Sequence, residues 1–344
     1  DKSGADALRF SIVMISPRGS DIFFSEESLN VGRNFANKVW NASKLVINNC
    51  PERTLGTDFP ALNDLTTADK WILYRLALAY REINEHLEEF RFNDAAIAIH
   101  RFIWHEFCDW YLEITKSAMY DKTTPEHKQN VQTILVNSLS VALQLLHPFM
   151  PFITEEVWNN LYDNPPSIMV SPWRDITEFE SLHEDAKAFE CVRNAVSCLR
   201  TMRSEIGISP GKQVDAILAT SDSDIRAILE ASRQDIEFLA KLNSLDLQDS
   251  PKPPEVRATA VTEDGVDAFI DLEGVIDIPA EIDRLQKDMK KTEIELKKVN
   301  GKLSNESFVA KAPEAVVEKN RRIQGELTTK LEKLNEALNK LRSI

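Results

Sequence analysis

Amide and cationic side chains repeat on one side of the segment 32–47. Its apolar residues, among them Phe35, Val39 and Val46, recur at helical spacing and would face a core, which leaves the polar residues on the opposite face. Amides can read base edges and cations can hold phosphates, so this face has the chemistry needed to bind single-stranded RNA. An ordinary solvated helix face has the same composition, and that alternative stays open. The candidate residues are Arg33, Asn34, Asn37, Lys38 and Asn41.

A second set of cations lies near the C-terminus, at the outer positions of an apolar 3,4 repeat. A contact surface for a phosphate backbone would suit cations spaced along one rigid helix, whereas a solvated coiled-coil face is the plainer alternative. These residues are Arg284, Lys287, Lys290, Lys291, Lys297 and Lys298.

Catalytic or metal chemistry is less well supported. His147 stands near Glu155 and Glu156, but Pro148 and Pro151 end the preceding helix, and we expect Thr154 to cap the next one with both glutamates in its first turn. His100 and His105 are five residues apart and do not share a helix face well. The chain has no Gly-rich phosphate loop, no H-E-x-x-H and no G-x-S-x-G. We therefore predict no catalytic residue and no metal site.

Most of the first 200 residues have helical periodicity. Five long amphipathic helices with aromatic inner faces predict a helical bundle, in which Phe149, Phe152 and Trp158 of the proline corner would pack inward. Residues 1–31 show no helix start and look like the end of a preceding domain. The helices are expected at about 32–47, 67–90, 93–117, 125–146 and 185–202.

Composition changes after residue 207, and a small α/β module is expected. Short strand patterns alternate with two helical ones, and Thr262–Gly265 is a hairpin turn signal. The expected strands are 213–219, 256–261 and 268–271, and the expected helices are 222–231 and 234–242.

The C-terminal segment predicts an antiparallel coiled-coil hairpin. Two apolar seams, starting at Ile282 and Val317, flank a break at 304–315, and Pro313 would start the return helix. Each arm would be roughly 35 to 40 Å long. Flanking charges would complement each other across the seam, with Asp288, Glu293 and Glu295 on the first arm and Arg321, Lys330 and Arg342 on the second.

Charge is distributed unevenly along the chain. The net charge of −14 argues against a polyanionic partner, but residues 280–344 carry +4 while residues 1–199 carry −10 and residues 200–279 carry −8. The four cysteines show no C-x-x-C pairing, and neither a long apolar span nor an N-terminal signal pattern is present. These features favour a reducing, cytoplasmic setting.

Five stretches occur together, and in this order they resemble the C-terminal portion of a valyl-tRNA synthetase over essentially the whole chain. The terminal hairpin and its turn resemble the valyl enzyme in particular, whereas the first three stretches are shared more loosely with isoleucyl and leucyl enzymes. The stretches are GADALRF at 4–10, GRNFANKVWNA at 32–42, HPFMPFITEEVW at 147–158, SIMVSPW at 167–173 and LSNESFVAKAPEAVV at 303–317.

The resemblance implies a mainly α chain of four parts. Residues 1–31 would be the junction after a missing catalytic domain, and 32–199 an anticodon-binding helical bundle. Residues 200–279 would be the small α/β module, and 280–344 a coiled-coil arm that packs on the tRNA elbow. The first helix would contact the anticodon through Arg33, Asn34, Asn37, Lys38 and Asn41, and the six cations from Arg284 to Lys298 would contact the elbow.

The resemblance also implies a recognition role. The two ATP-binding signatures of this enzyme class, His-x-Gly-His and Lys-Met-Ser-Lys-Ser, are absent from the chain. The parent enzyme would use ATP and Mg²⁺ to join valine to its tRNA, while this chain alone would be inactive and hold no cofactor. Expected partners are valine tRNA and the catalytic and editing domains of the same enzyme. No membrane contact is expected, and the chain would be a monomer.

Two other interpretations stay open. The chain could be a helical interaction protein without an RNA partner, which its acidic charge and complementary seam would suit. Alternatively it could be the matching region of an isoleucyl- or leucyl-tRNA synthetase. An intact enzyme is disfavoured by the missing nucleotide motifs.

Overall fold

The computed structural model describes residues 4–16, 24–25, 27–120, 124–275, 278–304 and 314–342. The chain divides into two compact units, Asp1–Cys191 and Val192–Ile344, which are considered one after the other. Among the described residues, no helix combines the length and hydropathy needed to cross a bilayer.

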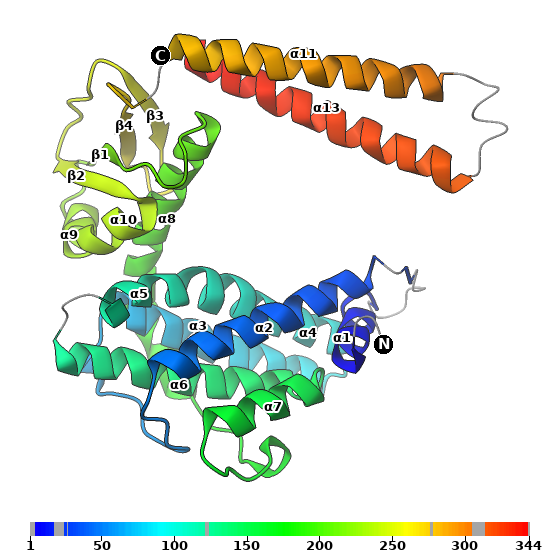
Figure 1. The fold of residues 1–344 in the computed structure, drawn as a ribbon. Coiled ribbons are helices and arrows are strands. Elements are labelled where there is room, and N and C mark those ends of the chain that lie inside the picture. Colours follow the sequence, from blue (N-terminus) through cyan, green and yellow to red (C-terminus); the bar gives the residue numbers. More distant parts are fainter. Residues whose placement is uncertain are drawn as a thin grey trace. The chain divides into compact units, whose positions relative to one another are not determined.

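The first unit is a helical bundle, as the sequence predicted (Figure 1). Its core is rich in aromatic side chains, and Trp71, Phe35 and Phe107 are all fully buried. The helices of this unit are α1 (Ala5–Met14), α2 (Leu29–Asn49), η1 (Leu62–Asp64), α3 (Thr67–Glu88), α4 (Phe92–Arg101), η2 (Phe102–Tyr111), α5 (Leu112–Tyr120), α6 (Pro125–Leu146), α7 (Pro151–Leu161), η3 (Ile168–Val170), η4 (Thr177–Leu182) and the first part of α8 (His183–Glu205).

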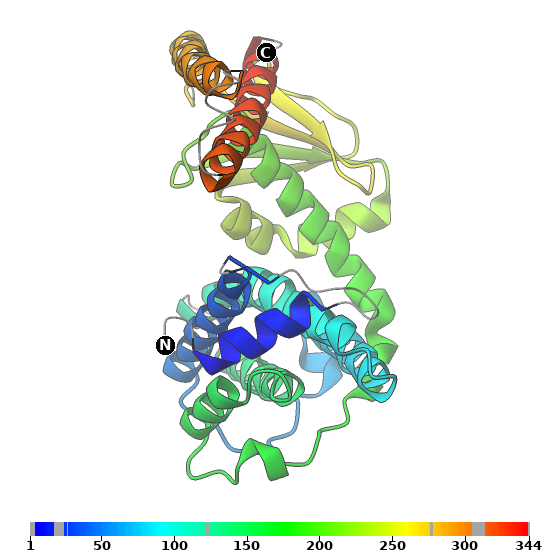
Figure 2. The same cartoon turned by 90° about the vertical axis from the view of Figure 1, so that its right-hand side faces the viewer.

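Helix α1 corrects the expectation that residues 1–31 contain no helix start. Its N-cap is Gly4, which offers no side-chain cap, so the local sequence lacks the usual start signal. Contacts with the bundle hold it instead. The ring of Phe10 lies 4.7 Å from that of Phe35, and Arg9 Nη2 donates a 3.1 Å hydrogen bond to the carbonyl of Pro148. Figure 2 shows α1 lying across the bundle.

The proline corner at 147–158 differs from its prediction at four residues. Helix α7 begins at Pro151, so Thr154 is buried inside the helix and donates to the carbonyl of Met150 instead of capping the N-terminus. Glu155 and Glu156 consequently lie beyond the first turn. Phe149 and Trp158 pack inward as predicted, but Phe152 is 68 % exposed.

A residue from α1 caps α7. The Asp6 carboxylate accepts hydrogen bonds from the backbone N–H groups of Phe152, at 3.3 Å, and Ile153, at 2.7 Å. Negative charge there also complements the helix dipole. The cap is a long-range contact of a buried side chain, so neighbouring sequence could not reveal it.

Replacing Asp6 with alanine is expected to lower the free energy of unfolding by about 1–2 kcal/mol, because two N–H groups at the start of α7 lose their acceptor. Urea unfolding followed by circular dichroism measures the change. Asp163→Ala, which removes an exposed carboxylate just beyond the end of α7, is the matched control and should change stability by less than about 0.5 kcal/mol. Equal effects of the two substitutions would contradict the cap.

The second unit begins with the rest of α8 and continues with the small α/β module. A four-stranded sheet has the order β2-β1-β4-β3, with β1 parallel to β2 and the other two pairs antiparallel. The hairpin turn at Thr262–Gly265 is confirmed, with Gly265 at φ 76°. The elements are β1 (Val214–Ala219), α9 (Ser223–Ala231), α10 (Arg233–Ala240), β2 (Leu242–Gln248), β3 (Arg257–Val261) and β4 (Asp267–Asp271).

The rest of the second unit is the predicted antiparallel hairpin. Helices α11 (Ile278–Leu303) and α13 (Glu314–Arg342) pack along an apolar seam in which Leu285 and Leu338 are buried. Gln324 Nε2 also donates a 2.7 Å hydrogen bond to Asn300 Oδ1 across the seam. Residues 305–313, with the predicted helix start at Pro313, lie outside the described residues.

The seam charges do not all behave as expected. Asp288 accepts a 2.9 Å hydrogen bond from Arg284, and its carboxylate lies 3.9 Å from the ammonium group of Lys291. Both cations are on the same helix as Asp288. Arg321 likewise pairs with Glu318 on α13 at 3.0 Å. The predicted complementarity across the seam is therefore wrong for Asp288 and Arg321, whose nearest partners lie three or four residues away along the same helix.

Candidate nucleic-acid interface

The outer face of α2 carries most of the polar residues that the sequence singled out. Phe35, Val39 and Val46 are buried against the bundle, which turns the opposite side of α2 to solvent. Successive residues advance by 100°, so the exposed candidates fall within an arc of about 100°. None of their side chains has a hydrogen bond or ion pair with another described residue. We call Arg33, Asn34, Asn37 and Asn41 the polar face of α2.

Lys38 departs from this set. Its ammonium group lies 2.6 Å from Asp109 Oδ1 and 5.0 Å from the centre of the Trp104 ring, and its side chain is 31 % exposed. Both partners belong to η2. Lys38 thus joins α2 to η2, and its assignment as an RNA contact stays a prediction.

The segment η2 is a ten-residue π-helix, where the sequence had predicted a plain α-helix through 93–117. Turns of π-helix are rare in proteins. Those that do occur are often found at functional sites. The altered winding also corrects the prediction for His100 and His105, because their rings meet edge to face at 6.1 Å. Burial, with a smaller contribution from His105, lowers the pKa of His100, which keeps it neutral at neutral pH.

The described residues contain no cluster of three or more His, Cys, Asp or Glu able to hold a metal ion. Two of the thiols are also poor nucleophiles, because burial raises the pKa of Cys50 and Cys108 to about 12. His147 Nδ1 lies 2.7 Å from Thr154 Oγ1, and burial lowers the pKa of this histidine. Its contacts are explained by the corner that it stabilises.

The cations predicted on the arm all face solvent. On α11 they fall within an arc of about 140° whose centre lies opposite the apolar seam, and the set extends along roughly 21 Å of the helix. Arg284 and Lys291 are paired with Asp288, as described above. The other four, which we call the outer lysines, are Lys287, Lys290, Lys297 and Lys298.

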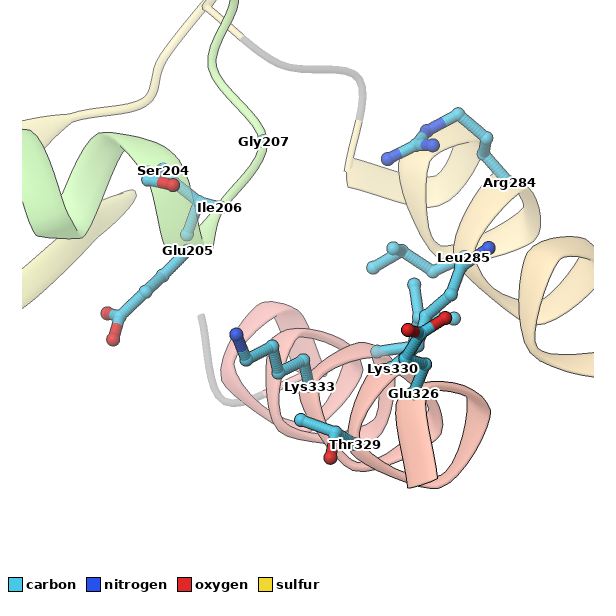
Figure 3. Close-up of a pocket in the computed structure, with 11 residues that line it drawn as sticks. Ser204, Glu205, Ile206, Gly207, Arg284, Leu285, Glu326, Thr329, Lys330 and Lys333 are labelled. Carbon is cyan, nitrogen blue, oxygen red and sulfur yellow. The ribbon is translucent and has the colours of Figure 1, made fainter. Parts of the chain in front are cut away.

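A cavity of about 630 Å³ in the second unit is lined by the end of α8 and by both arm helices. Figure 3 shows Glu205 and Gly207 on one side and Arg284 and Lys333 on the other. Carboxylates and cations are mixed in its lining, so the cavity favours neither an anion nor a cation. We assign it no ligand.

One feature beside the polar face of α2 was not predicted from the sequence. Trp40 is 38 % exposed and lines a groove opposite the exposed Phe152. The signal was present in part, because Trp40 follows Arg33 by seven residues and so shares its side of the helix. Phe152 gave no such signal, since the proline corner made an inward position the simplest expectation.

Two family models match the chain. One, described as the anticodon-binding domain of tRNA ligase, covers residues 69–218, and it begins after α2. The other, described as the valyl tRNA synthetase tRNA binding arm, covers residues 277–342.

Curated relatives match essentially the whole chain. The valine–tRNA ligase of Enterococcus faecalis is 36 % identical over 100 % of this chain and 39 % of the relative. Those of Aquifex aeolicus and Symbiobacterium thermophilum are 35 % and 37 % identical over 100 % of this chain, covering 30 % and 40 % of the relatives. The chain therefore spans about two fifths or less of the length of these relatives.

Among solved structures, a ternary complex of Agrobacterium radiobacter K84 leucyl-tRNA synthetase with tRNA covers 64 % of this chain and 22 % of that chain. The identity is 19 % and the TM-score 0.42.

Proposed function

The chain belongs to the valyl-tRNA synthetase family, and from this premise we propose that it is the C-terminal, tRNA-recognition part of a valine–tRNA ligase. The main support for the proposal is the position of the outer lysines on the arm. The segment that matches the valyl tRNA-binding arm model is also the segment in which the outer lysines face away from the seam, where the hairpin itself does not need them.

The proposal gives the two units separate roles. The bundle binds the anticodon through the polar face of α2, and the arm contacts the phosphate backbone of the tRNA elbow. Two distant contacts on one ligand raise its affinity beyond that of either contact alone. Valylation itself, with its ATP and Mg²⁺, belongs to the catalytic domain of the parent enzyme, which we propose acts as a monomer in the cytoplasm.

The direct experiment is a titration of the 344-residue chain with a valine tRNA transcript and a non-cognate tRNA at fixed salt. We expect tighter binding of the valine tRNA. If neither RNA binds at physiological salt, the chain is instead a helical interaction protein, the function that its acidic net charge would suit. Equal binding of both RNAs would leave a tRNA-binding role without valine specificity.

Arg33 gives the cleanest test of the polar face. Arg33→Glu is expected to weaken binding of valine tRNA by about tenfold, since a charge-assisted contact to the RNA is replaced by repulsion. Reversal of Lys38 would also break its ion pair with Asp109 and disturb the bundle, so it is a poorer probe. Filter binding at fixed salt measures the change. Lys252→Glu, in the acidic α/β module, is the charge-matched control. Unchanged affinity of the Arg33 variant would remove this residue from the interface.

A further inference from the structure

A groove of about 380 Å³ is lined by α2, by α7 and by the start of α1. Ala36 and Trp40 line it from α2, and Phe152 and Ile153 line it from α7. Two large aromatic side chains are left partly in solvent here, Trp40 at 38 % and Phe152 at 68 % exposure. Burying either ring in a partner would recover hydrophobic free energy that the isolated chain does not gain.

The groove is continuous with the polar face of α2. Helical spacing places Arg33, Asn37, Trp40 and Lys44 within about 60° of one another, in a stripe roughly 16 Å long. Arg33 and Lys44 are exposed and lie on either side of the indole along the helix. A cation, an amide, an aromatic ring and a second cation therefore follow one another along one exposed line. This order of groups suits a single nucleic-acid strand, whose phosphates and bases alternate.

The acidic groups at the groove decide which part of a nucleotide could enter it. The Asp6 carboxylate is already bound by two N–H groups at the start of α7. Glu156 is exposed and accepts a 3.1 Å hydrogen bond from Asn160 Nδ2, which leaves acceptor capacity unused. Carboxylates repel a phosphate, but they accept hydrogen bonds from the exocyclic amine of a base. The groove thus favours a base, while the stripe of α2 favours the phosphates beside it.

We propose that this groove holds one unpaired base of the tRNA, stacked against Trp40 and Phe152, an inference that rests on the proposed function. The proline corner then has a binding role, because its exposed phenylalanine forms the second wall of the site. Stacking does not depend on which base is present, so the site adds affinity more than sequence specificity.

The test compares removal of the two groove rings with removal of an exposed ring outside the groove. Trp40→Ala and Phe152→Ala should each weaken binding of a valine tRNA transcript by about tenfold, with the slope of log affinity against log salt unchanged, because stacking releases no counterions. Trp40→Phe and Phe152→Tyr should retain most of the affinity. Phe90→Ala removes an exposed ring of the same type, 75 % exposed, from outside the groove, and it should bind as the unchanged chain does.

The outcomes separate this proposal from the proposed function. If the unchanged chain binds no tRNA, the proposed function fails first and the stacking site with it. If the unchanged chain binds tRNA and both alanine variants bind equally well, the groove serves a contact with protein and the stacking proposal is overturned. Weakened binding that the aromatic replacements do not rescue, or that changes the salt slope, also overturns it. Circular dichroism of each variant confirms that the bundle is intact.

Discussion

Replacing the outer lysines of α11 with glutamine is expected to weaken binding of valine tRNA on the order of 100-fold at about 0.1 M salt. These side chains lie opposite the seam, so their removal costs the hairpin no apolar contact. Glutamine has a helix propensity close to that of lysine, and the arm should stay helical. Any loss of binding then reports the charges alone.

The salt dependence is the more specific readout. Each lysine that neutralises a phosphate releases close to one counterion, so the slope of log affinity against log salt should become shallower by about 3 to 4. Deleting residues 280–344 should flatten the slope at least as much. An unchanged slope in both variants would mean that the outer lysines only solvate the arm.

A second four-charge variant controls for net charge. Cations of α13 face solvent as well, and their neutralisation changes the overall charge by the same amount. If the outer face of α11 is the contact surface, this control should change the slope by less than about 1. Equal effects of both variants would point to non-specific attraction between a charged arm and RNA. The control residues are Lys319, Arg322, Lys330 and Lys333.

The parts of the fold that depend on local periodicity could be predicted from the sequence. The apolar repeat of the arm defines its own partner surface, so both helices and their seam followed from spacing alone. Strand β2 shows the opposite case. Its sequence, LNSLDLQ, is mostly polar because it lies at the edge of the sheet, and pairing with β1 makes it a strand. The predicted helix ran to Leu242, whereas α10 ends at Ala240 and Lys241 adopts a left-handed conformation.

The candidate site was only partly predictable for the same physical reason. Exposure of the polar face of α2 follows from the helix period. The ion pair that engages Lys38 comes from Asp109, which is 71 residues away in sequence and lies on an unpredicted π-helix. Phe152 is exposed because α7 starts at Pro151, earlier than a Thr154 cap would allow. Local signals predicted most of the helices, and long-range contacts decided which side chains remain accessible.

Gly32→Ala is expected to destabilise the bundle by about 2–3 kcal/mol, or to displace α1 from it. A Cβ at this position would lie 2.2 Å from the carbonyl oxygen of Ala7 and 2.8 Å from Ser11 Oγ. The Gly32 N–H also donates a 3.0 Å hydrogen bond to Ser11 Oγ at this buried contact. Neither neighbour can move away easily, because the Ala7 oxygen is backbone and Ser11 is fully buried.

Two glycines of the arm provide a control in which the expected change in stability has the opposite sign. Gly301 and Gly325 are also helical, and an added Cβ would meet no atom within 4 Å at either position. Alanine there should be neutral or should stabilise its helix by about 0.5–1 kcal/mol, since glycine is the poorer helix former. The same substitution thus has opposite expected effects, and the close approach of α1 to α2 accounts for the difference. Urea unfolding measures all three variants.

The Gly32→Ala substitution should also affect tRNA binding. Displacement of α1 would remove the Asp6 cap from α7 and the α1 residues that line the groove beside Trp40 and Phe152. We therefore expect weaker tRNA binding with an unchanged salt slope, as for the aromatic variants and unlike the outer lysines. A Gly32→Ala chain as stable as the original would contradict the packing of α1. One that is destabilised yet binds tRNA at full affinity would show that α1 stabilises the bundle without shaping the RNA-binding surface.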